Sequence, residues 1–430
     1  MLLREHPHVV ILGGGFGGLA AARALRRAPV SVTLIDRVNH HVFQPLLYQV
    51  ATAALTAPDV SAPIRRLLRN QHNARVWMGE VSRIDPAEKR VVVDGVTLGY
   101  DYLIVALGMQ NAYFGHDGWA KHAPGLKTVG DALDIRRRIL RAFEAAERSQ
   151  TETERRTFTT FAVIGGGPTG VELAGAIAEI AGRTLAREFR NFNPRMTRVL
   201  LLEAGPRLLP SFPEHLSRRA RNDLEHLGVE VRTGAPVSEI GPGFVEIAGT
   251  RIATHTVLWA AGVRASELTV QLGAPLDRAG RLPVRDDLSL SDHPEVLVVG
   301  DLIGKMPDGG VLPGVAQVAI QSGRHAALNV LRSVQGRPRA PFRYVDRGAM
   351  ATIGRHRAVA RLGRFTFTGI FAWWLWVWVH VFALVNYRAR IAVLFEWSWS
   401  YFTWQRRSRV ILEVPVSPPR SEPRLAPVSR

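Results

Sequence analysis

The chain of 430 residues is too long for one ordinary domain and suits two or three. Hydrophobic residues make up 47% of it, which is enough for a substantial core and excludes general disorder. The absence of cysteine excludes structural disulfides, a redox-active dithiol, cysteine-ligated iron–sulfur clusters and a thiolate nucleophile. The formal charge of +18 comes almost wholly from arginine and favours contact with anions: a phosphate-bearing cofactor, nucleic acid or an anionic membrane surface.

A complete dinucleotide-binding pattern opens the chain, and no signal-peptide pattern precedes it. A predicted strand at residues 8–12 leads into a glycine-rich loop, a helix at 20–28 and a strand at 30–35 that ends in Asp36. The loop consists of Gly13, Gly14, Gly15, Phe16, Gly17 and Gly18. Glycines at this spacing allow a tight turn, close approach of a pyrophosphate and close helix packing, while the acid binds ribose hydroxyls. The unit therefore predicts a nucleotide site.

The segment at residues 39–52, NHHVFQPLLYQVAT, mixes polar and aromatic residues without a helix or strand period. Its adjacent His40 and His41 invite a metal-site interpretation, but no third ligand stands at metal-binding spacing. We predict instead that the segment lies along an extended cofactor and covers its ring.

The rest of the first unit is predicted from short apolar runs and polar breaks. We expect two strands of a small antiparallel sheet at 76–84 and 90–93, a buried strand at 100–108, a helix at 131–149 and a polar connector at 150–156.

A second glycine-rich loop follows a predicted buried strand at residues 161–164. Its glycines are Gly165, Gly167 and Gly170, at the spacing of the first loop. The helix after them is expected to reach residue 189, and a strand at 198–202 then ends in Glu203. An acid at this position favours NADH over NADPH, although nearby arginines can bind a 2′-phosphate.

The second unit then repeats the order of the first. We expect a helix at 216–227, a short strand at 229–231, a hairpin at 244–252 and a strand at 256–260 before Gly262. A further strand at 296–299 ends at Gly300 and Asp301, and a helix at 312–331 carries the sequence AQVAIQ from Ala316 to Gln321.

These residues together resemble the two-dinucleotide-binding-domain flavoproteins and, within them, the type II, non-proton-pumping NADH:quinone oxidoreductases. The general motifs are the two glycine loops with their acids, the glycines that end the buried strands, and Gly300-Asp301. The more specific motifs are FQPLLYQVAT at residues 43–52 and AQVAIQ at 316–321, which matches the AQxAxQ pattern associated with quinone reduction in that family. The resemblance extends to about residue 409.

The resemblance implies an α/β fold with two Rossmann-like domains, the second inserted in the first, and a membrane-associating helical segment at the end. It implies that the first unit binds FAD and the second binds NADH. The residues expected around the cofactors, besides both glycine loops, are Asp36, Asn39, His40, Gln44, Val81, Gly108, Glu203, Gly262, Asp301, Ala316 and Gln317.

Three residues would carry the chemistry by this resemblance. Glu172 would lie beside the nicotinamide and flavin rings, and Gln317 and Gln321 would face the quinone headgroup. Each has a simpler interpretation as well: an acid in a first helical turn favours the helix dipole, and an i, i+4 glutamine pair can be a polar helix face.

The C-terminal region changes composition sharply. Residues 370–385, IFAWWLWVWVHVFALV, are almost wholly apolar, and more tryptophans follow among arginines up to residue 409. A single membrane crossing or a buried helix pair are alternatives, because a spanning helix needs about 20 apolar residues. We favour two helices lying in the membrane interface, where tryptophan and arginine concentrate. Residues 413–430 are predicted to be a disordered tail.

The predicted domains are an FAD-binding domain at 1–120 and 286–343, an NADH-binding domain at 121–285 and a membrane-docking region at 344–412. The function expected is NADH:quinone oxidoreduction on the cytoplasmic face of the inner membrane, with ubiquinone or menaquinone as partner. We expect no metal and no nucleic acid, and leave a homodimer open. The alternatives are a flavin-dependent reductase with another acceptor and a redox-sensing flavoprotein.

Overall fold

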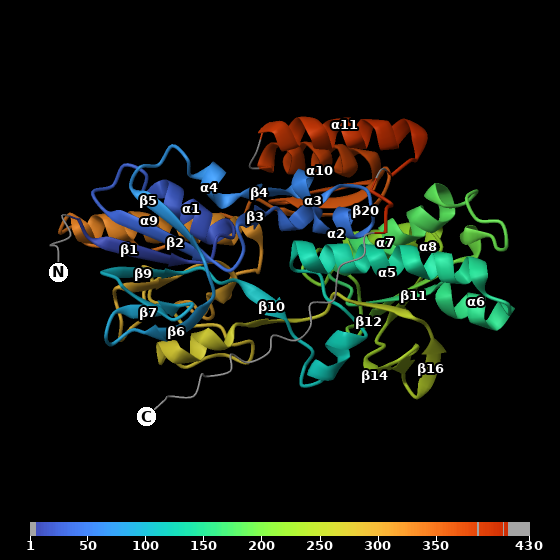
Figure 1. Cartoon of the computed structure of the whole chain (residues 1–430), viewed down its shortest axis with the longest axis horizontal. Helices are drawn as coiled ribbons and strands as arrows, with labels where there is room; N and C mark the ends of the chain where they lie inside the picture. The colour runs from blue at the N-terminus through green and yellow to red at the C-terminus, as the bar shows by residue number, and fades with distance from the viewer. Residues whose placement is uncertain (1–5, 385–386, 407, 412–430) are drawn as a thin grey trace, which may run out of the picture.

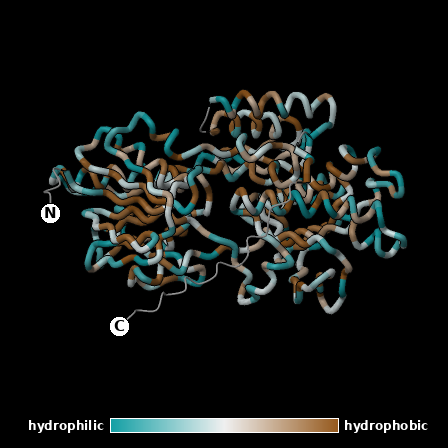
Figure 2. Tube along the Cα trace, in the orientation of Figure 1, coloured by the Kyte–Doolittle hydropathy of each residue, from teal (hydrophilic) through white to brown (hydrophobic). Residues whose placement is uncertain are grey.

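The computed structural model describes residues 6–384, 387–406 and 408–411, so the predicted tail lies outside the described residues. Two α/β units lie side by side, with a pair of C-terminal helices above their junction (Figure 1). Apolar residues concentrate along the central strands of both units (Figure 2), as expected for parallel sheets covered on both faces.

The first unit is built on a parallel sheet in the order β19-β9-β1-β2-β5. Its strands are β1 (His8–Leu12), β2 (Ser31–Asp36), β5 (Ala74–Met78), β9 (Tyr102–Val105) and β19 (Val296–Val298). β19 follows the whole second unit in sequence but pairs with β9. The second unit is therefore inserted in the first, as the fold class predicted from the resemblance requires.

The helices α1 (Phe16–Ala24) and α9 (Ala316–Val334) pack against each other beside this sheet. Their approach is close because Gly17 and Gly323 face each other: a Cβ on Gly323 would overlap the carbonyl oxygen of Gly17. The first glycine loop and the AQVAIQ sequence are thereby brought to one place. The short elements between β2 and β5 are β3 (His40–Val42), α2 (Leu47–Ala51), α3 (Ala57–Val60), β4 (Ser61–Pro63) and α4 (Ile64–Leu67).

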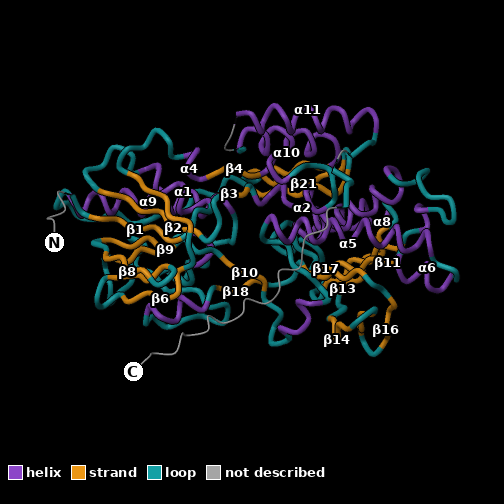
Figure 3. The backbone as a smooth tube through the Cα atoms, viewed as in Figure 1, coloured by secondary structure: helices purple, strands orange, loops and turns teal. Residues whose placement is uncertain are grey.

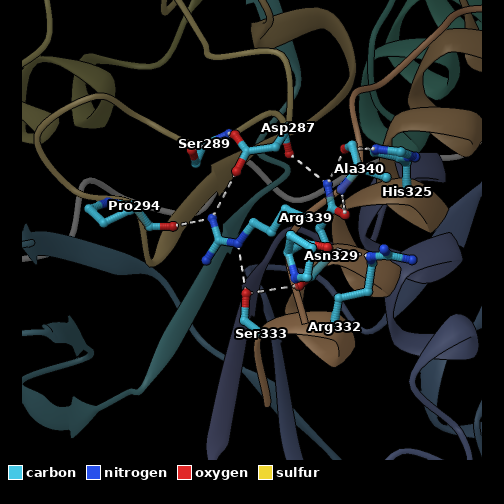
Figure 4. A network of polar contacts seen from close by, with 10 residues as sticks. Asp287, Ser289, Pro294, His325, Asn329, Arg332, Ser333, Arg339 and Ala340 are labelled. Carbon is cyan, nitrogen blue, oxygen red and sulfur yellow. Dashed lines mark hydrogen bonds and ion pairs between the residues drawn. The ribbon is translucent and has the colours of Figure 1, made fainter. Parts of the chain in front are cut away.

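A polar network fixes the far end of α9 (Figure 4). The Arg339 guanidinium donates from Nη1 to Asp287 Oδ2 at 3.2 Å and from Nε to Ser333 Oγ at 2.7 Å. Asn329 exchanges two hydrogen bonds of 2.9 Å with the backbone of Ala340. These bonds hold the C-terminal half of α9 against the loops at 287–294 and 337–340.

The second unit has a parallel sheet in the order β13-β12-β11-β17. Its strands are β11 (Thr160–Ile164), β12 (Arg198–Glu203), β13 (Val229–Thr233) and β17 (Thr256–Trp259). The helices of this unit are α5 (Val129–Arg148), α6 (Glu152–Phe158), α7 (Pro168–Glu179) and α8 (Glu214–His226). As in the first unit, the central strand leads directly into the glycine loop.

Each unit also carries a three-stranded antiparallel sheet, and a two-stranded link joins the units (Figure 3). The small sheets are β6 (Val81–Asp85), β7 (Arg90–Val93), β8 (Val96–Gly99) and β14 (Val237–Gly241), β15 (Phe244–Ile247), β16 (Thr250–Ala253). The link pairs β10 (Met109–Asn111) antiparallel with β18 (Val263–Ala265). The segment that leads out of the first unit therefore lies beside the segment that returns to it.

Three sequence predictions are wrong in detail. The run at 76–84 divides into β5, which pairs with β2 in the parallel sheet, and β6, which pairs with β7; Gly79 lies between them. The expected connector at 150–156 contains α6, whose N-cap Thr151 accepts a hydrogen bond from the Glu154 amide. The helix expected to reach residue 189 ends at Glu179 and continues only as a π-helical turn, Ile180–Thr184.

The C-terminal region is a sheet of β20 (Ala349–Gly354), β21 (Arg357–Leu362) and β22 (Phe365–Thr368), followed by α10 (Gly369–Ala383) and α11 (Tyr387–Thr403). The two helices lie antiparallel above α2, α3 and β20 (Figure 1). Among the described residues, none of the helices combines the length and the apolarity needed to cross a bilayer.

Candidate functional site

The first glycine loop has the geometry of a pyrophosphate cradle. Gly13 has a φ of +101°, and a Cβ there would overlap the carbonyl oxygen of Ala106 at the end of β9. A Cβ on Gly18 would overlap the Gly13 oxygen, so the helix packs tightly on the turn. A Cβ on Gly15, by contrast, would meet nothing within 4 Å. The protein therefore leaves space at the one glycine where a phosphate would approach the backbone.

The second loop repeats this arrangement position by position. Gly165 has a φ of +112° and lies against Ala260 at the end of β17, and a Cβ on Gly170 would overlap the Gly165 oxygen. A Cβ on Gly167 would again meet nothing within 4 Å. Both loops thus fit a dinucleotide, each at the N-terminus of a helix.

The two acids hold their loops in the same way. Asp36 Oδ2 accepts the amide of Gly14 at 2.6 Å, and its Oδ1 accepts the amide of Val38 at 2.9 Å. Glu203 accepts the amide of Gly166, as well as that of Gly205 at 2.6 Å. The carboxylates lie beside the loops at the ends of the second strands, where an adenosine ribose would lie.

Residues of the 39–52 segment lie around the first loop. The buried His41 pairs through Nδ1 with the Gly14 carbonyl oxygen at 3.0 Å, and the Phe16 ring contacts it edge-on at 5.0 Å. Burial lowers the pKa of the His41 imidazole. Asn39 is exposed and its Oδ1 lies 3.0 Å from the Nδ1 of the half-buried His40. From the sequence, a metal site at His41 was discounted and the whole 39–52 segment was predicted to lie along a cofactor. The contact of His41 with the loop depends on a fold that spacing does not reveal.

The charge of Lys127, a residue given no role from the sequence, acts on Asp301. Burial raises the pKa of the Asp301 carboxyl, and the charge of Lys127 opposes that shift. The carbonyl of Lys127 also accepts a hydrogen bond from the exposed Gln44 amide at 3.4 Å. One signal was available: Lys127 is among only four lysines in a chain of 55 basic residues.

The AQVAIQ sequence forms the first turns of α9, and its two glutamines have different surroundings. Gln321 accepts the Val345 amide at 3.0 Å and donates to the Val345 carbonyl at 2.9 Å, so its amide is engaged by the backbone leading to β20. Gln317 lies one turn earlier with Ala316, both half-buried, close to Gly314, whose Cβ position faces Asp301.

Glu172 lies in the first turns of α7, where this helix packs against β20 and α2. Burial raises the pKa of its carboxyl well above the ordinary value, and a hydrogen bond from the Thr352 backbone only partly opposes this shift. The carboxyl therefore favours its protonated form more than a solvated glutamate does.

The remaining predicted residues lie at three places. Val81 begins β6 in the small antiparallel sheet. Gly108 follows β9 with a φ of +64° and open space around it. Gly262 follows β17 with a φ of +75°, and the exposed ring of Phe114 lies against it. Phe114 was not singled out from sequence because nothing local distinguishes it. Within the described residues, no group of three or more metal-binding side chains comes together.

Comparison with protein families agrees with this geometry. Residues 7–323 match the family model of pyridine nucleotide-disulphide oxidoreductases, and residues 347–405 match the NDH2 C-terminal domain. The chain has no cysteine, so it shares the cradle of the first family without its disulfide.

Two curated relatives come from Mycobacterium tuberculosis. The type II NADH:quinone oxidoreductase NdhA is 48% identical over 85% of this chain and 82% of its own length. The type II NADH:quinone oxidoreductase Ndh is 45% identical over 86% of this chain and 83% of its length.

Among solved structures, NDH2 from Plasmodium falciparum in complex with NADH superposes with a TM-score of 0.87 at 20% identity, covering 95% of this chain and all of that one. The sulfide:quinone oxidoreductase of Aquifex aeolicus gives 0.70 at 19% identity, over 94% and 92%. These likenesses concern the fold, whereas the mycobacterial relatives share sequence along most of the chain. The chain belongs to the family of type II NADH:quinone oxidoreductases.

Proposed function

We propose that this FAD-dependent enzyme oxidises NADH at the second glycine loop and reduces a membrane quinone, a ubiquinone or a menaquinone, near Gln317 and Glu172. FAD in the first cradle would accept hydride from NADH and supply two electrons to the quinone. The single observation that supports this best is the duplicated cradle: Gly15 and Gly167 both leave open space where a pyrophosphate would approach.

The residues of the first unit would bind and orient FAD. Asp36 would hold the adenosine ribose, with Asn39, His40 and Gln44 along the cofactor and the Val81 backbone at its adenine end. Asp301 would accept hydroxyls of the ribityl chain. The positive charge of Lys127 opposes the effect of burial on Asp301 and so favours the ionised carboxylate.

Glu172 would hold a proton for the quinone. A quinone oxygen that gains electrons also needs a proton, and a general acid must keep one until then. The raised pKa of Glu172 suits that task, since burial favours the protonated carboxyl. Gln317 would orient the headgroup by a hydrogen bond from its amide, while Gln321 would hold the wall of the site through Val345.

The C-terminal helices would dock on the membrane from the cytoplasmic side, where NADH is available. On α10 one face carries Phe371, Trp374, Trp378 and Phe382, all exposed. On α11 the exposed apolar residues are Tyr387, Ile391, Leu394, Phe395, Trp399 and Phe402. Exposed apolar faces of this size are typical of a membrane or protein contact, and tryptophan favours the headgroup level. A homodimer stays a prediction.

A test uses detergent-purified protein and a water-soluble quinone. NADH should bleach the bound flavin, and added quinone should restore the colour and sustain turnover. Glu172→Gln should keep flavin and bleaching but slow the quinone step about tenfold, the effect of roughly 1.4 kcal/mol on a barrier. Glu154→Gln, on the exposed face of α6, is the matched control.

Quinone-independent turnover would favour a reductase with another acceptor, and bleaching without turnover would favour a redox sensor. An unchanged quinone step in Glu172→Gln would remove this residue from the mechanism.

A further inference from the structure

The ring of Phe114 lies on the glycine that follows β17. Phe114 stands shortly after β10, which belongs to the link between the two units (Figure 3). A Cβ on Gly262 would overlap the Cζ atom of this ring and lie 2.9 and 3.0 Å from its two Cε atoms. The Phe114 side chain is nevertheless 68% exposed. The ring therefore covers Gly262 and is itself left largely uncovered by the protein.

The first unit leaves the equivalent place open. In each unit the first glycine of the loop lies against an alanine of the neighbouring strand end, Ala106 in the first and Ala260 in the second. Two residues later stand Gly108 and Gly262, with φ of +64° and +75°. A Cβ on Gly108 would meet nothing within 4 Å, whereas one on Gly262 would meet the Phe114 ring. The two cradles thus differ at one matching position, and the difference is this ring.

The strand order indicates which half of a dinucleotide passes over Gly262. In the second sheet β11 lies between β12, which ends in Glu203, and β17. The acid at the end of β12 binds the adenosine ribose, and the loop after β11 binds the pyrophosphate. The nicotinamide half of NADH then extends to the other side of the loop, over the end of β17. The Phe114 ring lies in that path.

The backbone around Phe114 is anchored while its ring is not. The indole Nε1 of Trp259 donates to the Ala112 carbonyl at 3.0 Å, and the hydroxyl of the buried Tyr113 donates to the Ala123 carbonyl at 2.8 Å. Directly after these anchors Phe114 has a φ of +52°, a left-handed conformation that costs such a residue about 1–3 kcal/mol. The anchors hold the backbone in this conformation, whereas rotation about the side-chain bonds can move the ring.

We propose that Phe114 is a gating residue of the NADH site. In the free enzyme its ring fills the place of the nicotinamide half over Gly262, and a side-chain rotation clears this place when NADH binds. Ring and nucleotide compete for one space, so the ring lowers the affinity for NADH. This inference rests on the proposed assignment of NADH to the second loop and deepens it.

Two ligands separate the halves of the nucleotide. NAD⁺ carries both halves and leaves the oxidised flavin unchanged, whereas ADP carries only the adenosine half and the pyrophosphate. In the oxidised holoenzyme, Phe114→Ala should bind NAD⁺ about threefold more tightly than the wild type, a modest gain because a ring that is 68% exposed loses little packing when it moves. The Kd for ADP should stay unchanged. Val270→Ala, at another exposed apolar side chain, is the matched control.

The absence of cysteine allows the ring to be restored chemically. Phe114→Cys gives the holoenzyme its only thiol, and N-phenylmaleimide then attaches an aromatic ring to it. The unlabelled variant should bind NAD⁺ as Phe114→Ala does, and labelling should weaken NAD⁺ binding by at least about threefold without changing the Kd for ADP. Val270→Cys, labelled in the same way, should show no change. An NAD⁺ affinity that labelling leaves unaltered would contradict the placement of the nicotinamide half beside residue 114.

Stopped flow distinguishes access from chemistry. At limiting NADH, Phe114→Ala should bleach the flavin about threefold faster, because NADH no longer has to displace a ring. The limiting rate at saturating NADH and the reoxidation by a soluble quinone should stay within about twofold of the wild type. Flavin content and the thermal midpoint should also stay unchanged, which a merely structural role of the ring would not allow.

The outcomes separate this inference from the proposed function. Weaker NAD⁺ binding in Phe114→Ala would make the ring a contact of the bound nucleotide and not a gate, and an equal affinity would mean that the ring lies outside the path; either result overturns the proposal. Gly167→Ala should weaken the binding of both NAD⁺ and ADP. Were it to weaken neither, the assignment of NADH to the second loop would itself fail; weakened binding in Gly167→Ala beside an unchanged Phe114→Ala refutes only this inference.

Discussion

The two glycine loops of this enzyme share one backbone geometry and lie in different surroundings. The first is enclosed by distant parts of the chain: a Cβ on Gly14 would overlap Ile64 of α4, and one on Gly17 would lie 3.0 Å from Val299 and 3.4 Å from the Ala319 carbonyl of α9. In the second loop, a Cβ on Gly166 would instead meet Leu208 and Glu203 of its own unit.

We expect this difference to separate a resident cofactor from an exchanging substrate. FAD in the first loop would lie beneath β3, α9 and the C-terminal helices, so that its release would require several elements to separate. NADH in the second loop would meet mainly residues of one unit and the exposed Phe114 ring. On the proposed assignment, two loops of similar backbone geometry would release their nucleotides at different rates, because the rest of the chain surrounds them differently.

The largest expected effect comes from filling the open space in each loop. Gly15→Ala and Gly167→Ala add a methyl group that meets no protein atom, at positions with φ of −68° and −73° that alanine adopts freely. Folding should be unaffected, while a bound pyrophosphate should clash. Gly15→Ala should lower flavin content and Gly167→Ala should raise the KM for NADH, each about tenfold if the clash costs about 1.4 kcal/mol.

Flavin absorbance per protein, the KM for NADH and the thermal midpoint distinguish these outcomes. The two variants serve as controls for each other, because each should leave the opposite property unchanged. Loss of flavin in Gly167→Ala would show that the second loop also supports flavin binding. That result would contradict the assignment of one nucleotide to each loop.

A smaller effect is expected from the two acids. Glu203→Gln keeps the size of the side chain and an oxygen for the Gly205 amide but removes the charge that repels a 2′-phosphate. NADPH should become about fivefold better relative to NADH, which corresponds to about 1 kcal/mol, the worth of a partly exposed charge interaction. Asp36→Asn, the matched change in the first loop, should alter flavin retention and leave this ratio unchanged. If Glu203→Gln leaves the ratio of NADPH to NADH activity unaltered, Glu203 does not determine which of the two nucleotides is preferred.

The sequence predicted the parts of this enzyme that depend on local pattern. The two glycine loops, Asp36 and Glu203 stand next to their strands in sequence, so spacing sufficed for the two α/β units. The strand at 76–84 was wrongly read as one element because apolar content does not reveal which sheet a strand joins. The difference between Gln317 and Gln321 also escaped prediction, since it arises from a backbone contact with Val345, distant in sequence.

The C-terminal region shows the same limit. Its composition indicated interfacial helices, and α10 and α11 do expose apolar faces. Nothing in that composition indicated that Trp397 would reach Gln49 or that Arg406 would reach Thr52, because these contacts join the two ends of the described chain. Long-range contacts of this kind cannot be predicted without the fold.

The smallest expected effect concerns the packing of helix α10 against the residues around the first loop. His380 of α10 stacks on Trp376 at 4.2 Å and meets Phe43 edge-on at 6.2 Å, and Phe43 in turn contacts Phe16 of the first loop. Burial lowers the pKa of His380 to about 4 from an ordinary 6.5. Between these values the unfolded chain binds a proton that the packed helix does not, so stability is complete above pH 6.5 and falls as the pH is lowered toward 4.

The loss should reach about 2 kcal/mol for this partly exposed ring, somewhat less than the full shift would give. It should appear as faster flavin release at pH 5 than at pH 7.5, measured by dilution into flavin-free buffer. NADH affinity should change little over the same range, because the packing of His380 on Phe43 and Phe16 involves the first loop and not the second. His380→Phe keeps a ring against Phe43 and removes the titration; it should reduce the pH dependence, with the buried His41 accounting for the remainder. An unchanged profile in His380→Phe would mean that the C-terminal helices do not secure the resident cofactor.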